Sequence, residues 1–426
     1  MSYVRIEGGK KLEGELLLQG SKNAVLPILA AAVLCRGKVV LENCPDISDV
    51  RELLYALSLA GVKSRFCEGT LELDTEDAVP YFFGPELAGK TRGGVLLLGA
   101  FWGRFWEAGM AYPGGCVIGA RPIDLHCKVF RRLGAKLSEE ATGVYLCGKP
   151  AGGHIVLTYP SVGATENAVL AAVCAKGTTV ISGAAREPEV TELCRFLNCA
   201  GAKIYGFGTD CIRVDGVSRL HGTDYTVAGD RIVAGTYLGA AAITGGEVRL
   251  TGTRNVCMKG IFECFRSLGA RVYRDGDAML LCAPKRLRAI PKLVTAPYPG
   301  FPTDMQSQTV AMLSVAEGDS CVVETVFEAR FGIVTELRKM GADVTLESRS
   351  MQIRGREVLH GAAVDATDLR SGAALVLAGL AAEGETVVAG YEYIARGYED
   401  ICGALLKLGA LIVHAEENDR KDGEKL

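Results

Sequence analysis

Hydrophobic and polar positions repeat along this chain with a long period. Six times, an apolar stretch with helical spacing ends at a short segment around a glycine, and a strand-like run follows. Apolar positions at i, i+3 and i+4, such as Leu53, Leu54 and Leu57, predict a helix before each glycine. Neighbouring copies are 67 to 73 residues apart, and their glycines are Gly61, Gly134, Gly201, Gly269, Gly341 and Gly409.

A second phrase lies about 24 residues before most of these glycines. In this phrase an Ala/Leu-rich helical stretch ends in a glycine, and a β-branched strand follows. We expect each glycine to be the left-handed C′ residue of a helix; they are Gly37, Gly177, Gly246, Gly318 and Gly384. The unit therefore reads strand–helix–strand–helix–strands, which predicts an α/β protein. It is too long for the usual solenoid repeats of about 20 to 50 residues. Six such units suit two domains of three units each.

The second unit is interrupted. Around residues 103–122 it carries a Gly- and Pro-rich stretch where the short glycine–strand link would stand. Functional residues concentrate in loops that a rigid scaffold positions. We therefore expect function to be concentrated near this interruption.

Composition excludes several classes of protein. The chain has 426 residues, of which 49% are hydrophobic and 23% charged, so it has ample material for a core. Its net charge of -3 offers no long-range attraction to nucleic acid or to an anionic membrane. No apolar run reaches the length of about 18 residues that a membrane span needs, and the first residues lack the apolar stretch of a signal peptide. These features predict a cytoplasmic protein.

Fifteen cysteines and five histidines are scattered without metal-ligand spacing. We expect most of the thiols to be buried and inert. We predict neither a metal nor an organic cofactor.

Six phrases then resemble the enolpyruvyl transferase family, in the branch that acts on UDP-N-acetylglucosamine. They occur in the family's order and spacing, and the resemblance runs from about residue 3 to 414. The phrases are GSKNAVLPIL (20–29), PGGCVIGARPIDLH (113–126), SVGAT (161–165), AAREPEV (184–190), FPTDMQ (301–306) and RGYE (396–399).

The resemblance implies two inside-out α/β barrel domains, each built from three βαβαββ repeats. One domain would span residues 22–229 and carry the Cys116 loop. The other would combine 1–21 with 230–414, and 415–426 would be a charged tail. In the family, substrates bind in the cleft between the two domains.

The implied reaction transfers the enolpyruvyl group of phosphoenolpyruvate to the 3′-hydroxyl of UDP-N-acetylglucosamine and releases phosphate. It is the first committed step of peptidoglycan precursor synthesis and proceeds by addition and elimination.

By resemblance Cys116 is the general acid, and it is the residue that fosfomycin alkylates. The neighbouring Arg121 is a cation that can lower a thiol pKa. Asp304 is the candidate base; since arginines surround it, we expect a low pKa and a role in orienting the hydroxyl. An alternative makes Thr303–Asp304 a helix N-cap.

The resemblance also implies the binding residues. Two highly anionic substrates need converging Arg and Lys side chains. Phosphoenolpyruvate would meet Lys22, Asn23, Arg121, Arg330, Arg370 and Arg396, with Arg330 and Arg370 near its carboxylate and Lys22, Arg121 and Arg396 facing its phosphate. For Asn23, a helix N-cap is the alternative role. The UDP-sugar would meet Arg92, Arg121, Pro122, Ile123, Asp124, Leu125, Ser161, Val162, Gly163, Asp304 and Val326. If the Ser-Val-Gly turn begins a helix, its N–H groups suit a phosphate. Acidic partners for the cations would be Asp49, Glu187, Glu189, Asp230 and Asp368.

Some positions depart from the family pattern, and they leave the acceptor open. They are Gly93, Leu96, Val233, Ala329, Tyr393 and Ala395. One alternative is a sister enzyme that uses shikimate 3-phosphate, against which the PGGC and SVGAT phrases argue. Others are a carboxyvinyl transferase with another nucleotide-sugar acceptor and a binding-only paralogue. The sequence does not decide the oligomeric state.

Overall fold

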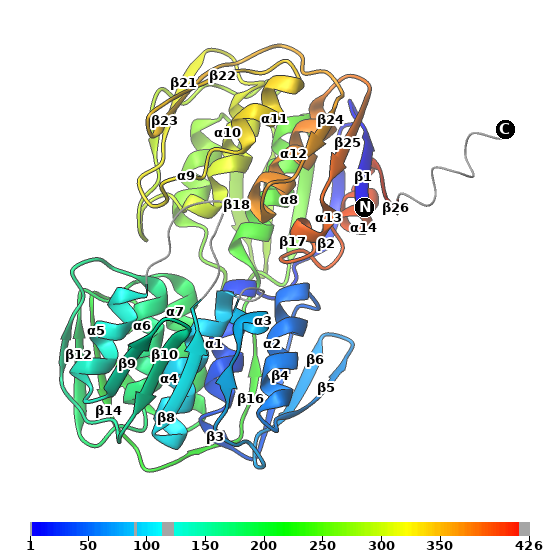
Figure 1. Ribbon diagram of the computed structural model, residues 1–426. Coiled ribbons are helices and arrows are strands. Elements are labelled where there is room, and N and C mark those ends of the chain that lie inside the picture. Colours follow the sequence, from blue (N-terminus) through cyan, green and yellow to red (C-terminus); the bar gives the residue numbers. More distant parts are fainter. Residues whose placement is uncertain (1, 89–91, 113–122, 417–426) are drawn as a thin grey trace. The chain divides into compact units, whose positions relative to one another are not determined.

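The computed structural model describes residues 2–88, 92–112 and 123–416. By its internal contacts the chain divides into two compact units (Figure 1). Unit 1 combines residues up to Gln19 with residues from Gly229 onward, and unit 2 lies between Gly20 and Ala228. The domain limits given above stay a prediction.

Unit 1 is built from three four-stranded sheets and the helices between their strands. Its strands are β1 (Ser2–Glu7), β2 (Glu13–Leu17), β17 (Glu247–Thr251), β18 (Arg271–Asp275), β19 (Ala278–Cys282), β20 (Leu293–Val294), β21 (Asp319–Val323), β22 (Asp343–Glu347), β23 (Ser350–Arg354), β24 (Ala363–Asp365), β25 (Glu385–Ala389) and β26 (Leu411–Glu416). Its helices are α8 (Arg231–Thr244), α9 (Lys259–Ser267), η2 (Thr303–Met305), α10 (Gln306–Leu313), α11 (Ile333–Lys339), α12 (Leu369–Ala381), α13 (Tyr391–Ile394) and α14 (Ile401–Lys407).

Unit 2 repeats this plan and adds one two-stranded sheet. Its strands are β3 (Cys35–Arg36), β4 (Lys38–Glu42), β5 (Lys63–Cys67), β6 (Thr70–Asp74), β7 (Phe82–Phe83), β8 (Glu107–Ala111), β9 (Lys136–Glu140), β10 (Gly143–Cys147), β11 (His154–Val156), β12 (Thr178–Ser182), β13 (Lys203–Tyr205), β14 (Cys211–Asp215), β15 (Leu220–His221) and β16 (Asp224–Thr226). Its helices are α1 (Lys22–Ala32), α2 (Ser48–Leu59), α3 (Pro85–Ala88), η1 (Arg92–Gly94), α4 (Val95–Phe105), α5 (Asp124–Arg132), α6 (Val162–Ala172) and α7 (Pro188–Cys199).

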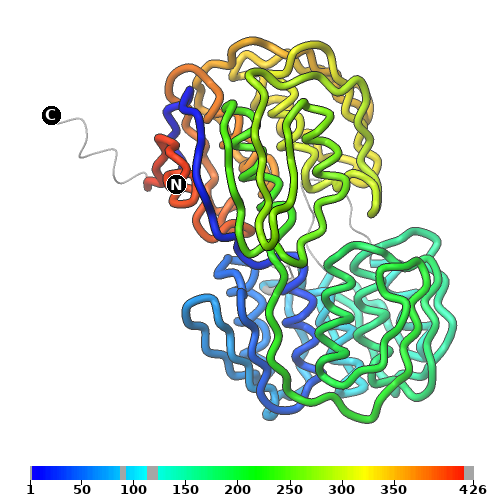
Figure 2. Tube along the Cα trace, turned by 180° about the vertical axis from the view of Figure 1, so that it is seen from behind, coloured from blue at the N-terminus to red at the C-terminus, as the bar shows by residue number. Residues whose placement is uncertain are grey.

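All six four-stranded sheets have the same pattern of parallel and antiparallel strand pairs. One parallel pair is followed by two antiparallel pairs, as in β11–β12, β12–β14 and β14–β13. Three sheets are completed by a strand from far along the chain. β1 pairs with β25 and β26, β2 with β17, and β16 with β4. Figure 2 shows the blue N-terminal strand among the red C-terminal segments. The predicted α/β class and the βαβαββ repeat are confirmed.

The helices that follow the first strand of each repeat form the core. In unit 1, α8, α10 and α12 pack on one another; in unit 2, α4 packs on α1 and α6. Residues 370–380 of α12 and 306–313 of α10 are buried all round. A helix that is buried on every face is mostly small and apolar, as α12 is from Gly372 onward, and buried polar residues such as Gln306 and Gln308 of α10 form hydrogen bonds. In α4 this extends to Gly99, where a Cβ would lie 2.4 Å from Asn167 Oδ1 of α6.

The glycines of the first repeat phrase behave as predicted. In the second phrase Gly37, Gly177, Gly318 and Gly384 have the predicted positive φ, but they do not stand at the C′ position. All six glycines of the first phrase follow a helix and have φ between +84° and +99°. In the second phrase α1, α6 and α10 end several residues before Gly37, Gly177 and Gly318, so these glycines are not C′ residues. The reason is a short extended segment after the helix, such as β3, which pairs with β15. After α8 the left-handed residue is Gly245, and Gly246 has no positive φ.

The expectation of mostly buried thiols is wrong for the described cysteines. Of fourteen, six are buried, four are half-buried, and four are exposed: Cys67, Cys147, Cys199 and Cys211. The exposed thiols lie at strand ends and at the end of α7, where side chains point away from the core. Among the described helices, none is long and apolar enough to cross a membrane.

Candidate active site

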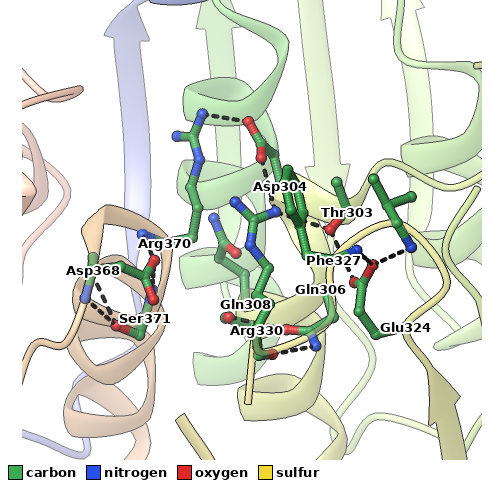
Figure 3. A network of polar contacts seen from close by, with 12 residues as sticks. Thr303, Asp304, Gln306, Gln308, Glu324, Phe327, Arg330, Asp368, Arg370 and Ser371 are labelled. Atoms are coloured by element: carbon green, nitrogen blue, oxygen red, sulfur yellow. Dashed lines mark hydrogen bonds and ion pairs between the residues drawn. The ribbon is translucent and has the colours of Figure 1, made fainter. Parts of the chain in front are cut away.

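Asp304 lies at the centre of a charge cluster in unit 1. It belongs to η2, the short turn directly before α10. Its Oδ1 accepts a hydrogen bond from Arg330 Nη1 at 2.9 Å, and its Oδ2 accepts one from Arg370 Nη2 at 2.8 Å (Figure 3). Arg330 comes from the loop before α11, and Arg370 is the second residue of α12. Three distant segments therefore meet at one carboxylate.

Glu324 fixes the loop that carries Arg330. Its Oε1 accepts hydrogen bonds from the backbone N–H groups of Val326 and Phe327, and its Oε2 accepts one from Thr303 Oγ1 at 2.9 Å. The same threonine oxygen accepts a hydrogen bond from Arg330 Nη1 at 2.9 Å. The guanidinium carbon also lies 4.7 Å from the centre of the Phe327 ring, within cation–π range. These contacts hold the guanidinium of Arg330 in one orientation.

Charge and burial set the protonation states in this cluster. Arg330 is 6% exposed and Arg370 4%. Burial alone would raise the pKa of Asp304, but the charges of Arg370 and Arg330 outweigh burial and hold this pKa well below its usual range. Burial likewise acts to lower the pKa of Arg370, and the charge of Asp304 overcomes that effect and raises it. Asp304 is therefore an ionised carboxylate and a weak proton acceptor, as expected from the sequence.

Helix caps account for two of the predicted acidic partners. Asp368 Oδ1 accepts hydrogen bonds from the backbone N–H groups of Arg370 and Ser371, and Ser371 completes a capping box. Asp368 therefore positions the backbone of Arg370 rather than its guanidinium. Asp230 caps α8 in the same way, and its charge also contributes to the raised pKa of Arg370.

The RGYE phrase forms a turn between α13 and α14 that places Arg396 half-buried in unit 1. Tyr398 is 1% exposed, and its hydroxyl lies 2.7 Å from Thr236 Oγ1 of α8. Gly397 packs closely against α12, since a Cβ there would lie 2.7 Å from Leu369 Cδ2. The turn that carries Arg396 is thus fixed to two core helices.

Lys22 forms the second charged centre, in unit 2. It is the first residue of α1, and its Nζ lies 2.7 Å from Oδ2 of the buried Asp49 in the first turn of α2. Asp49 is therefore an acidic partner of a predicted cation. Asn23 is the second helical residue, and the N-cap is Ser21. The alternative that Asn23 caps the helix is wrong. So is the N-cap alternative for Thr303–Asp304, because the N-cap of α10 is Met305 and no side chain caps it.

The Ser-Val-Gly turn begins α6, which is the condition under which its N–H groups suit a phosphate. Ser161 is the N-cap, and its Oγ accepts a hydrogen bond from the N–H of Ala164. Val162 and Gly163 are the first helical residues, so their N–H groups belong to the set that has no partner within a helix. At Gly163 a Cβ would lie 3.1 Å from His126 Cε1. The glycine thus lets the histidine ring approach the start of the helix.

His126 is held in one tautomer by Asn167. Asn167 Oδ1 accepts a hydrogen bond from the N–H of Gly99, which places the amide nitrogen on the other side, 2.7 Å from His126 Nδ1. Since the amide nitrogen can only donate, Nδ1 must accept, and the ring proton lies on Nε2. Burial lowers the pKa of His126 to about 4. The ring is therefore neutral at physiological pH.

The remaining predicted residues are placed only in part. Cys116, Arg121 and Pro122 lie outside the described residues, as does the side chain of Arg92 in η1. Ile123 is the N-cap of α5, and Asp124 and Leu125 begin that helix. Asp124 is exposed and pairs with Lys128 at 3.3 Å.

Glu187 and Glu189 lie at the start of α7, where Glu189 is buried. Their charges add to burial in raising the pKa of Glu166 in α6 well above its usual value.

Sequence reasoning missed Thr303, Gln306, Glu324 and Tyr398. Thr303 and Gln306 flank Asp304 in its phrase, which was a usable signal, and Gln306 Nε2 donates a hydrogen bond to the carbonyl oxygen of Arg330. No signal marked Glu324, because a single glutamate after a strand is usually exposed. Among the described residues, no cluster of three or more His, Cys, Asp or Glu side chains is placed to hold a metal ion.

Similar proteins are found along nearly the whole chain. Residues 6–405 match the family model for EPSP synthase (3-phosphoshikimate 1-carboxyvinyltransferase). The chain is 45% identical over 415 residues to UDP-N-acetylglucosamine 1-carboxyvinyltransferase 2 of Caldanaerobacter subterraneus subsp. tengcongensis, which covers 97% of this chain and 99% of the relative. It is 43% identical over 420 residues to the UDP-N-acetylglucosamine 1-carboxyvinyltransferase of Acinetobacter guillouiae, with 98% and 100% covered.

Solved structures of enolpyruvyl transferases have the same fold as this chain. The enolpyruvyl transferase NikO from Streptomyces tendae superposes with a TM-score of 0.87 at 27% identity, covering 97% of this chain and 99% of that chain. EPSP synthase from Acinetobacter baumannii gives a TM-score of 0.76 at 19% identity over 98% and 100%, which shows the shared fold alone. The chain therefore belongs to the EPSP synthase family of enolpyruvyl transferases.

Proposed function

We propose that this protein transfers the enolpyruvyl group of phosphoenolpyruvate to the 3′-hydroxyl of UDP-N-acetylglucosamine and releases phosphate. The observation that carries the proposal is the carboxylate of Asp304 held between the buried Arg330 and Arg370. The names of the full-length relatives supply the acceptor. On this proposal the protein acts in the cytoplasm, at the first committed step of peptidoglycan precursor synthesis.

In the proposed addition step, the 3′-oxygen bonds to C2 of phosphoenolpyruvate while its own proton moves to Asp304 and a second proton reaches the methylene carbon. Cys116 supplies that proton as the general acid. Asp304 orients the 3′-hydroxyl, because a carboxylate with a low pKa is better suited to accept a hydrogen bond than to keep a proton. Arg330 and Arg370 bind the substrate carboxylate, which suits their planar donor groups.

In the elimination step, the Cys116 thiolate takes a proton from the methyl carbon of the tetrahedral intermediate and the bond from C2 to the phosphate oxygen breaks. The departing phosphate takes the proton that the 3′-hydroxyl gave to Asp304. Lys22, Arg121 and Arg396 would stabilise the departing phosphate, with Asn23 beside them. The UDP-sugar would lie along Arg92, residues 121–125, residues 161–163 and Val326. The N–H groups at the start of α6 are suited to its diphosphate.

Phosphate release with both substrates tests the proposal. We expect release by the wild type to require UDP-N-acetylglucosamine and to be lost after fosfomycin treatment or in Cys116→Ala. The matched control is Cys147→Ala, which removes an exposed thiol of β10 and should behave as the wild type. Shikimate 3-phosphate serves as the competing acceptor. Release with that acceptor alone, or none from folded wild type, would refute the proposal.

A further inference from the structure

Gln19 lies where the chain leaves unit 1, two residues after β2. Its side-chain amide is bonded at both ends to the turn that carries Arg396. Nε2 donates a hydrogen bond to the carbonyl oxygen of Gly397 at 3.1 Å, and Oε1 accepts one from the N–H of Glu399 at 3.1 Å. A single side chain thus spans the turn and bonds its backbone on both sides of Tyr398.

The backbone of Gln19 is tied to the second place where the chain passes between the units. Its carbonyl oxygen accepts a hydrogen bond from the N–H of Asp230 at 3.0 Å. Asp230 is the N-cap of α8, the helix whose Thr236 holds the hydroxyl of Tyr398. The boundary segments, the start of α8 and the Arg396 turn therefore form one connected hydrogen-bond network within unit 1.

Packing fixes the middle of this turn but not its two ends. Gly397 and Tyr398 are buried against α12 and α8, but Arg396 and Glu399 on either side of them are half-buried and exposed. In this part of the turn the amide of Gln19 supplies two hydrogen bonds that the backbone would otherwise make with water. Loss of the amide would remove these two hydrogen bonds and give the backbone around Glu399 more freedom, while Gly397 and Tyr398 stay packed against α12 and α8.

We propose that Gln19 is a positioning residue that holds the Arg396 turn in the geometry needed to bind the phosphate of phosphoenolpyruvate. This inference rests on the proposed function, in which Arg396 faces that phosphate. Gln19 itself touches no reacting atom and acts through the backbone of residues 396–399. Its effect should therefore fall on phosphoenolpyruvate and leave the UDP-sugar unaffected.

Three variants test this role. Gln19→Met keeps the length of the side chain and removes both hydrogen bonds. Gln19→Glu keeps the acceptor for the N–H of Glu399 and loses the donor to Gly397. The matched control is Gln352→Met, at an exposed position on β23. The readouts are KM and kcat for each substrate, and amide hydrogen exchange in residues 396–399.

We expect Gln19→Met to raise KM for phosphoenolpyruvate about fivefold, the effect of about one hydrogen bond. Its KM for UDP-N-acetylglucosamine and the values of Gln352→Met should not change. Exchange in residues 396–399 should accelerate in Gln19→Met and less in Gln19→Glu. An unchanged exchange rate would overturn the proposal, and so would faster exchange with an unchanged KM for phosphoenolpyruvate.

The two proposals fail in different ways. A wild type without turnover refutes the proposed function, and calorimetric binding of phosphoenolpyruvate then replaces KM as the second readout. In that case faster exchange with weaker binding in Gln19→Met still supports the role of Gln19. Faster exchange with unchanged binding contradicts it.

Discussion

At the scale of single residues, the structure separates two acidic roles that look alike in sequence. The resemblance implies a role near the cations for both Asp304 and Asp368, and both contact Arg370. Asp304 pairs with its guanidinium, whereas Asp368 accepts a hydrogen bond from its backbone N–H. The charge of Asp304 therefore interacts with two guanidinium groups, and the charge of Asp368 interacts with the N–H groups at the start of α12.

Replacing Asp304 tests the first of these roles. In Asp304→Asn two buried guanidinium groups lose their shared counter-charge, and the 3′-hydroxyl loses its charged acceptor. We expect kcat to fall about a hundredfold or more. Asp319→Asn, which changes an exposed aspartate paired with Arg354, is the control. Activity of Asp304→Asn within a few-fold of wild type, measured by phosphate release, would contradict the assigned role.

The buried His126 gives a pH dependence of stability. Its folded pKa of about 4 lies below the unfolded value of about 6.5, because burial outweighs the opposing charge of Asp124. The unfolded state then binds more protons between these values. Stability is full above about pH 6.5, falls as the pH drops, and levels off below about pH 4.

His126→Gln should flatten this part of the stability profile, and Gln keeps an acceptor for Asn167. The measurement is the free energy of unfolding from denaturant titrations between pH 7.5 and about 4.5. We expect the wild type to lose about 2–3 kcal/mol more than the variant over this range. Parallel profiles for the two proteins would show that His126 does not titrate as described.

At the scale of elements, the capping box of α12 connects helix stability to the site. Asp368→Ala removes the cap and should lower the free energy of unfolding by about 1 kcal/mol. Asp368→Asn keeps an N-cap oxygen and should remain close to the wild type. If the charge of Asp368 were paired with a guanidinium, Asn would destabilise the protein as much as Ala does. Thermal unfolding of the three proteins separates these two roles.

The repeat could be predicted from the sequence because its glycines mark helix ends. At Gly61, Gly134 and the four later copies, the chain must adopt a left-handed backbone before it enters a strand, which few other residues do readily. The second set could not be placed correctly, because tertiary pairing of segments such as β3 decides where those helices end. For the same reason, the local sequence pattern could not predict which strands pair with β1, β2 and β16.

The candidate site was predictable only as far as its residue types. The cations and Asp304 were marked by the resemblance to the family, and the low pKa of Asp304 followed from its charged neighbours. Which acid pairs with a cation and which caps a helix depends on distances, so Asp368 and Asp230 could not be separated from Asp49. Glu324 and Gln19 act through backbone groups far away in sequence, and no local pattern reports that.

At the scale of the whole molecule, unit 1 is assembled from both ends of the chain. β1 lies between β25 and β26, so its loss would leave both neighbours with an unpaired edge. A chain that starts at Gly8 should therefore show faster amide exchange in β25 and β26. The sheet of β11–β14 in unit 2 has no strand from the N-terminus and is the internal control. Equal exchange in both sheets after truncation would contradict this dependence.

The account's central claim is the identity of the reaction, and one measurement tests it most directly. The wild type is incubated with phosphoenolpyruvate, UDP-N-acetylglucosamine and shikimate 3-phosphate together, and the products are identified by mass and by nuclear magnetic resonance. We predict one new product, the 3′-enolpyruvyl ether of UDP-N-acetylglucosamine, formed in equal amount with phosphate. Recovery of unchanged UDP-N-acetylglucosamine beside enolpyruvyl shikimate 3-phosphate, or no product from folded protein, would contradict the account.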